Sequence, residues 1–115
     1  MQIVELAHRH ATAIREFDSV GAAALALANG AGDAHIYTLC FEPGGRIGPH
    51  VAGFGQMLVP LSGRGWVAGA DGERVFLGPG QAACWSRGEL HSKGSDTGMT
   101  ALMIQVRDLV PLPLD

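Results

Sequence analysis

The chain has 115 residues, of which 47% are hydrophobic and 17% are charged, a balance that excludes a disordered chain and suits one domain with a single core. Its formal net charge of −3 and its scattered basic residues exclude an electrostatic surface for nucleic acid. Seventeen glycines and six prolines interrupt short apolar runs, which predicts many tight turns and one all-β domain over residues 1–115.

The N-terminal part of the chain gives weak structural signals. Residues 3–6 predict a short strand. In residues 7–17 apolar side chains recur at helical spacing, but no good capping residue precedes them, so their structure stays open. Residues 22–28 favour a helix by propensity alone. We nevertheless predict a strand there, because Gly21 and Asn29-Gly30 bound the segment tightly.

No part of this sequence predicts export or a membrane partner. Residues 8–10 are His-Arg-His, where a secretion signal would need apolar residues, and the longest run of small apolar residues, 22–28, is too short to span a bilayer. We therefore expect a cytoplasmic protein. Cys40 and Cys84 both lie in apolar strand-like runs, so we expect both thiols to be reduced and structural.

Two strands with clear signals follow. Residues 35–42 are rich in β-branched and aromatic side chains and end at Pro43-Gly44-Gly45, which predicts a strand stopped by a turn. Residues 56–61 predict a strand that is apolar on both faces, so both faces need cover, and we expect a neighbouring subunit to supply one of them. Because Pro60 cannot donate a hydrogen bond to a ladder, this strand is at an edge or is bulged there.

The rest of the chain predicts short strands punctuated by turns, as in a sandwich or small barrel. Asp71-Gly72 predicts a two-residue type I′ hairpin loop. Residues 109–115 carry Pro111 and Pro113 and should form an extended arm. This arm and the strand over residues 56–61, which is apolar on both faces, together suggest a homodimer. The further strands are expected at residues 66–70, 73–77, 82–85 and 100–106.

Two glycine-bounded motifs, at residues 44–63 and 80–95, carry the histidines of most interest. His50 and Gln56 have the same parity along an extended backbone, so they would face one side of an unbroken strand. The motifs resemble the two motifs of the cupin superfamily, whose spacing is kept by Gly44, His50, Gln56, Gly63, Gly80, Gly88 and His91. The resemblance implies a single-domain cupin jelly roll, an antiparallel β-barrel that is commonly dimeric and carries its site inside the barrel.

The chain departs from the family pattern at two ligand positions. In complete cupins three histidines and one glutamate hold a divalent metal, whereas here Ala52 replaces the second histidine and Gln56 replaces the glutamate. The resemblance implies that the metal ligands would be His50, Gln56 and His91, with Zn, Ni, Fe or Mn as the ion. Affinity would be low, because no carboxylate offsets the charge of the metal. The alternative is a metal-free pocket whose histidines bond to Gln56 or to water. No organic cofactor is predicted.

Two functions remain open at this point. The substitutions at Ala52 and Gln56 favour a small-molecule-binding cupin without robust catalysis. The alternative is a metal-dependent enzyme (dioxygenase, isomerase or lyase) acting on a small polar or carbonyl compound, with His50 or His91 as the catalytic group. In either case we expect His50, Gln56 and His91 to converge in one cavity, with a small vacancy beside them at Ala52.

Other side chains carry weaker predictions. His35 is expected at the surface, and Glu89 is a candidate stand-in carboxylate two residues before His91. His8 and His10 look like a ligand pair but lack a partner motif. Packing roles are expected for Trp66 and Trp85, and places near the pocket mouth are open to Tyr37, Cys40 and Phe54.

Overall fold

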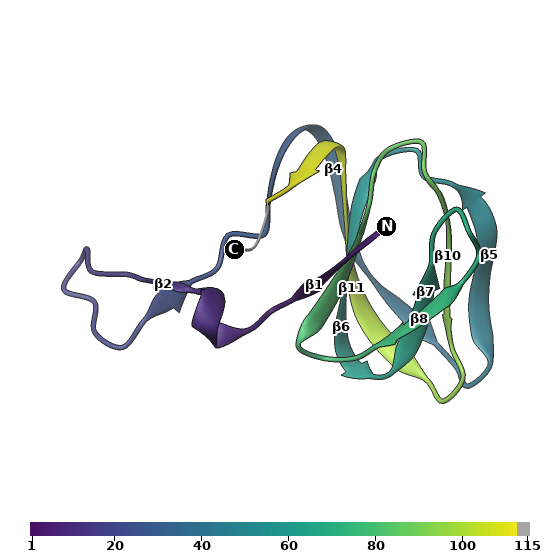
Figure 1. Ribbon diagram of the computed structural model, residues 1–115, viewed down its shortest axis with the longest axis horizontal. Helices are drawn as coiled ribbons and strands as arrows, with labels where there is room; N and C mark the ends of the chain where they lie inside the picture. The colour runs from purple at the N-terminus through teal and green to yellow at the C-terminus, as the bar shows by residue number, and fades with distance from the viewer. Residues whose placement is uncertain (113–115) are drawn as a thin grey trace.

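The computed structural model describes residues 1–112 and is built almost wholly of antiparallel strands in two main sheets (Figure 1). The five-stranded sheet has the order β1-β9-β6-β11-β4, and the four-stranded sheet has the order β5-β10-β7-β8. The predicted all-β class is therefore confirmed. The strands are β1 (Gln2–Glu5), β2 (Thr12–Ala13), β3 (Ala23–Ala24), β4 (Ala28–Phe41), β5 (Gly45–Val51), β6 (Gly55–Gly63), β7 (Gly65–Ala68), β8 (Arg74–Leu77), β9 (Gln81–Trp85), β10 (Leu90–Ser95) and β11 (Met99–Pro111).

The core lies between the two sheets. Alternate side chains of a strand point to opposite faces, and in β11 the inward set is Met99, Ala101 and Met103, each at most 4% exposed. Burying a side chain of the size of Leu58 or Met103 contributes roughly 1.5–3 kcal/mol to stability. The buried members of this core are Phe41, Leu58, Val67, Leu77, Ala83, Trp85, Met99, Ala101 and Met103.

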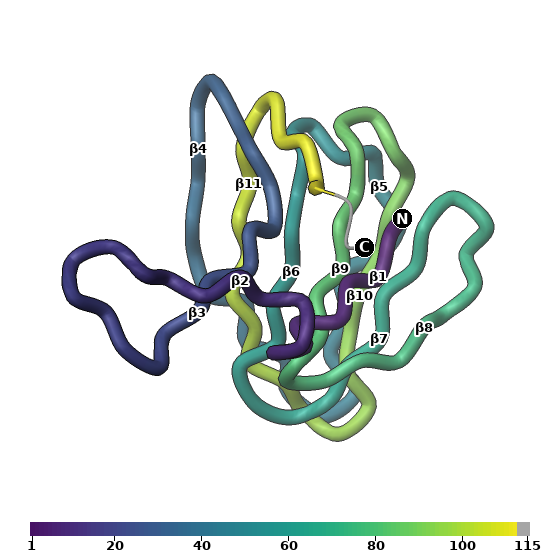
Figure 2. Tube along the Cα trace, turned by 60° about the vertical axis from the view of Figure 1, so that its left-hand side comes forward, coloured from purple at the N-terminus to yellow at the C-terminus, as the bar shows by residue number. Residues whose placement is uncertain are grey.

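The strands β4 and β11 form the longest ladder of the molecule. They pair from Met99↔Phe41 to Pro111↔Ala28, whereas β6 follows β11 only as far as Gly55↔Val106. Figure 2 shows β4, β11, β6 and β9 following one another across the sheet. The predicted C-terminal arm is thus part of β11 up to Pro111, and its last residues, 113–115, lie outside the described part of the chain.

The N-terminal segment folds differently from the prediction. Strand β1 (Gln2–Glu5) is confirmed, and η1 (His8–His10), a 3-10 helix, follows it. The continuous strand predicted over 22–28 is wrong, because Ala23–Ala24 pair with Thr12–Ala13 in an exposed two-stranded sheet and Ala28 already begins β4. Alanine side chains bury too little apolar area to hold a longer strand against a sheet. This sheet and its loop project from the body at the left of Figure 1.

Strand β6 is bulged at its proline, as predicted. Its pairing with β11 passes from Ser62↔Thr100 to Pro60↔Ala101, so that Leu61 is the extra residue of a β-bulge. Strand β11 pairs along one side of β6, whereas β9 pairs with the other side only at residues 56–58, so Pro60 lies beyond the end of the β9 ladder. Bulges and strand positions without a second partner are where a sheet tolerates a proline, because a proline has no N–H to donate.

The outer face of β6 is covered largely by the same chain. Met57 is 2% exposed and packs with Val4 and Cys84, against which Leu6 and Leu27 also lie. At Met57 this face therefore needs no neighbouring subunit for cover, whereas Leu61, on the same predicted face, is 54% exposed. The sequence did not reveal this because the covering residues come from the N-terminal segment, whose path local patterns do not determine.

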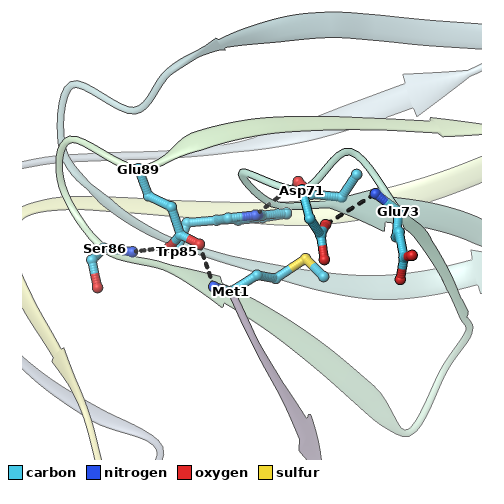
Figure 3. Close-up of polar contacts among 7 residues, drawn as sticks. Met1, Asp71, Glu73, Trp85, Ser86 and Glu89 are labelled. Carbon is cyan, nitrogen blue, oxygen red and sulfur yellow. Dashed lines mark hydrogen bonds and ion pairs between the residues drawn. The ribbon is translucent and has the colours of Figure 1, made fainter.

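The hairpin between β7 and β8 also differs from its prediction. Gly72 N–H donates to the carbonyl oxygen of Gly69 at 3.1 Å, and Gly72 has a φ of 74° while Asp71 does not have a positive φ. A type I′ loop needs two residues at positive φ, so the turn is of another type. Asp71 Oδ1 accepts a hydrogen bond from Glu73 N–H at 3.0 Å, which fixes the return of the chain (Figure 3).

In the part of the chain that the structure describes, no helix has the length and apolar character needed to cross a membrane.

Candidate functional site

A hollow of about 370 Å³ opens where the two sheets meet. It takes side chains from four strands and from the loop between β5 and β6. At its mouth His35 and Phe54 stack, with ring centroids 5.7 Å apart and an interplanar angle of 11°. The lining residues are His35, His50, Val51, Gly53, Phe54, Gln56 and Gln105.

His50 and Gln56 share this hollow for a reason that differs from the prediction. Their common parity is irrelevant, because β5 ends at Val51 and β6 begins at Gly55, and the two strands belong to different sheets. His50 pairs with His91 of the four-stranded sheet, and Gln56 pairs with residues of β9 and β11 in the other sheet. The short loop between β5 and β6 carries the chain from one sheet to the other, and this closure brings the two side chains together.

His91 lies behind His50 and is 1% exposed. The two rings have centroids 4.3 Å apart, and the indole of Trp85 meets the His91 ring edge-on at 5.0 Å. Trp85 thus packs in the core, as predicted, and also forms one wall around His91. Its indole Nε1–H donates to the carbonyl oxygen of Ala68 at 3.2 Å, which fixes the ring (Figure 3).

A lysine that the sequence analysis missed lies beside this histidine. Lys93 is 2% exposed, and its Nζ is 3.3 Å from His91 Nδ1 and 5.2 Å from the centroid of the Trp85 ring. Its position two residues after His91 on the same strand was a usable signal, because equal parity sends both side chains inward. A buried lysine is unusual, which is why a charged residue in a strand is ordinarily assigned to the solvent face.

The charges of this pair follow from their surroundings. The pKa of His91 is lowered to about 4, chiefly by burial and further by the positive charges of Lys93 and His50, while the Glu89 carboxylate acts weakly in the opposite direction. Burial lowers the pKa of Lys93 to about 8. At pH 7 His91 is therefore neutral and Lys93 is mostly an ammonium, which can only donate. Because Lys93 donates to Nδ1, the proton of the neutral His91 ring is on Nε2.

Two buried polar atoms have no partner within residues 1–112: one belongs to Gln56, which lines the hollow together with His50, and the other to His91, which packs against His50 but is not part of the lining. They are Gln56 Oε1, an acceptor, and His91 Nε2, which by the preceding argument is a donor. Leaving such an atom unsatisfied costs about 1–3 kcal/mol, so native proteins ordinarily pair them. The barrel therefore presents a complementary donor and acceptor next to a hollow of small-molecule size.

The donor atoms for a metal are less well arranged. His50 Nδ1 is 2.8 Å from the carbonyl oxygen of Gly48, so this nitrogen donates and Nε2 keeps its lone pair, as a metal ligand requires. His91 Nε2 carries the proton while Lys93 is an ammonium, so it could ligate only after Lys93 loses its charge. Within residues 1–112 no group of three or more His, Cys, Asp or Glu side chains is placed to hold a metal ion. A divalent ion bound to His50 and His91 would therefore need Gln56 as its third ligand and Lys93 as a neutral amine.

Neither Ala52 nor Glu89 has the place that the sequence suggested. Ala52 is 1% exposed and is not among the residues that line the hollow. Its backbone bonds to the β9–β10 loop, with N–H donating to Glu89 O at 2.9 Å. The Glu89 carboxylate is not a stand-in ligand, because it forms an ion pair with the Met1 amino group and accepts from Ser86 N–H at 3.1 Å (Figure 3).

The remaining candidates divide between the hollow and the surface. His35 is largely exposed, as predicted, but its ring forms part of the mouth, as does Phe54. Gln105, which the sequence analysis missed, also lines the hollow and donates from Nε2 to the Tyr37 hydroxyl at 2.8 Å. Cys40 is exposed, so its predicted structural role is wrong. The other candidates are Cys84, which is buried and has its thiol pKa raised to about 11 by that burial, and His8 and His10, which form η1.

Comparison with known proteins finds solved structures of similar architecture. No family model and no curated protein sequence matches the chain. Solved structures do match. A cupin superfamily protein from Desulfitobacterium hafniense superposes with a TM-score of 0.61 at 15% identity, covering 71% of this chain and 77% of its own. A cupin-like protein from Thermotoga maritima superposes with a TM-score of 0.61 at 21% identity, covering 70% and 65%.

A third similar structure is the DMSP lyase DddQ from Ruegeria pomeroyi, with a TM-score of 0.58 and 19% identity. The match covers 64% of this chain but only 38% of that longer enzyme. Identities at this level show the fold alone. The antiparallel sheets of this chain and these superpositions agree, and the chain has the cupin fold that its two motifs predicted.

Proposed function

We propose that this cupin barrel binds a small polar molecule at the hollow beside His50, Gln56 and His91. The observation that carries the proposal is the pair of unsatisfied buried atoms, Gln56 Oε1 and His91 Nε2. A ligand with an acceptor for His91 Nε2–H and a donor for Gln56 Oε1 removes the free-energy cost of both unsatisfied atoms. A compound with a hydroxyl group next to a carbonyl or carboxylate oxygen provides both the donor and the acceptor.

The charge of the site favours an oxygen-rich ligand. Lys93 is an ammonium held behind His91, and it polarises the ring so that Nε2–H becomes a stronger donor. The volume of about 370 Å³ suits a metabolite-sized molecule. At the mouth, the stacked rings of His35 and Phe54 offer an apolar face for the carbon skeleton of the ligand.

Saturation-transfer NMR with a library of small hydroxy acids, amides and sugars tests this proposal. We expect some members to bind. Gln56→Met and His91→Phe should each weaken the affinity for such a compound roughly tenfold, because each substitution removes one hydrogen-bonding group and keeps a side chain of similar shape. Gln2→Met, an exposed glutamine in β1, is the matched control and should change nothing. Affinities that are equal in all three variants would exclude this hollow as the site.

A metal-dependent enzyme is the second candidate, and one observation favours it. The contact between His50 Nδ1 and the Gly48 carbonyl leaves Nε2 open for a metal. His50, Gln56 and His91 would hold the ion, which would supply Lewis-acid polarisation of a substrate oxygen. This candidate is second because no carboxylate offsets the charge of the metal and the neighbouring Lys93 ammonium repels a cation.

Elemental analysis of protein purified without a histidine tag separates the two candidates. Near-stoichiometric Zn, Ni, Fe or Mn that is lost in His91→Ala would favour the enzyme. A double variant, His8→Ala with His10→Ala, is the control for adventitious binding at the N-terminal histidines. Metal that disappears in the control but persists in His91→Ala would show that the ion lies outside the barrel.

We also infer that the protein assembles as a homodimer through its projecting segment, defined as residues 11–26. Phe17 and Val20 of this segment are each 94% exposed, which is unfavourable for side chains of their size. The outer face of the five-stranded sheet offers an apolar hollow of about 460 Å³, with Met57 and Ile104 in its lining, where a second copy could receive them.

Light scattering at micromolar concentration tests the dimer. We expect the wild type to be dimeric and the double variant Phe17→Ser with Val20→Ser to shift toward monomer. Phe76→Ser is the matched control, because Phe76 is 51% exposed on the other sheet. A monomeric wild-type protein would contradict the inference.

A further inference from the structure

A second hollow, of about 360 Å³, lies on the outer face of the four-stranded sheet. Val67 points into the core, so its neighbour Trp66 points outward. Trp66 pairs across the sheet with Gly94, which in turn pairs with Arg46. The lining consists of Arg46, Gly48, Pro49, Trp66, Gly72, Arg74 and Ser92.

The indole of Trp66 lies against the backbone at Gly94. A Cβ atom at Gly94 would lie 2.7 Å from Trp66 Cζ2, which real side chains do not tolerate, so glycine is required here for the ring to lie this close. Arg74 stacks on the indole, with its Cζ 3.8 Å from the ring centroid. Such stacking holds the guanidinium plane in one orientation while its N–H edges stay available to a partner.

The charges around this hollow are unbalanced. Neither Arg46 nor Arg74 forms an ion pair with a carboxylate within residues 1–112, and no acidic residue is among those that line the hollow. Two like charges facing one space repel each other unless an anion lies between them. Ser92, which is only 7% exposed, adds a hydroxyl to the lining.

We propose that this hollow is an oxyanion site, separate from the barrel cavity, in which Arg46 and Arg74 hold a phosphoryl group. The planar fork of an arginine matches the oxygens of phosphate with two parallel hydrogen bonds, and a stacked arginine loses little freedom when it makes them. The chain carries a net charge of −3, so this basic pair is a local feature and not part of a generally basic surface. The ligand is inorganic phosphate or a small phosphate monoester, since both present the same oxygens.

An NMR titration tests the site. The indole N–H signal of Trp66 and the Nε–H signals of the arginines are followed while inorganic phosphate, methyl phosphate, succinate or chloride is added at equal ionic strength. We expect saturable shifts with phosphate, and Arg46→Gln and Arg74→Lys should each weaken binding roughly fivefold or more. Arg74→Lys keeps the charge but removes the fork and the stacking. Arg87→Gln, at an exposed arginine elsewhere, is the control and should leave the affinity unchanged.

Each outcome decides the proposal. Methyl phosphate binding more tightly than inorganic phosphate supports a phosphate ester, and equal binding supports free phosphate. Chloride producing the same shifts, or Arg87→Gln weakening binding as much as Arg46→Gln, would overturn the site. Succinate binding more tightly than both phosphates would overturn the phosphoryl assignment. Trp85 gives an internal reference, because its Nε1–H is bonded to the Ala68 carbonyl.

Discussion

Replacing Lys93 with methionine should stabilise this protein at pH 7. The lysine is 2% exposed, and burial lowers its pKa from 10.5 to about 8. At about 1.4 kcal/mol for each tenfold change in proton affinity, this difference corresponds to roughly 3 kcal/mol of cost for holding the ammonium inside the fold. Methionine fills a similar volume, carries no charge and packs well against the Trp85 ring.

The net gain is smaller than the full cost of the charge. The variant loses the contact with His91 Nδ1 at 3.3 Å, worth about 1 kcal/mol. We therefore expect Lys93→Met to raise the free energy of unfolding by roughly 2 kcal/mol, which is a rise in Tm of roughly 8 °C for a domain of this size. Urea denaturation in the presence of EDTA, followed by tryptophan fluorescence, measures the difference without interference from metal ions.

The pH dependence of that difference is the sharper test. Below pH 8 the lysine is charged in both the folded and the unfolded chain, so the full cost is present. Between pH 8 and 10.5 the folded protein has released the proton that the unfolded chain still holds, so the wild type gains stability relative to the variant as pH rises. The advantage of Lys93→Met should vanish at about pH 9.5, where the wild type has regained about 2 kcal/mol, and should reverse by about 1 kcal/mol near pH 10.5. A variant that is less stable at pH 7, or an advantage that does not change with pH, would refute the reasoning.

Three further predictions concern other parts of the fold. Gly94→Ala should cost more than about 2 kcal/mol in urea denaturation, since its Cβ would lie 2.6 Å from a backbone oxygen, whereas Gly48→Ala, with nothing within 4 Å, should cost little. At pH 8 a thiol reagent should label Cys40 quickly and leave Cys84 unlabelled until the chain unfolds, because burial raises the Cys84 pKa to about 11. The free energy of unfolding should fall as pH drops from 6.5 toward 4, because the histidine at position 91 binds a proton in the unfolded chain but stays neutral in the folded protein. This contribution should be absent in His91→Phe.

Local sequence patterns were sufficient for the architecture. The β-branched and aromatic runs, the glycine and proline turns and the two motifs predicted an all-β cupin fold, because each of these signals acts within a few residues. The β-bulge beside Pro60 is the clearest case, since a proline has no N–H for the ladder and therefore favours a bulge or an edge position. The residues of the candidate site were chosen in the same way, from motif spacing.

The tertiary structure decided what surrounds those residues. His50 and Gln56 were grouped by strand parity, but they meet because the loop between β5 and β6 switches sheets, which is a property of barrel closure and not of spacing. Lys93 became a buried ammonium through its neighbours from other strands. Those neighbours set its pKa and the tautomer of His91, and no local pattern contains them. Charge, burial and hydrogen bonding depend on contacts between distant parts of the chain, so the chemistry of the site was outside the reach of the sequence.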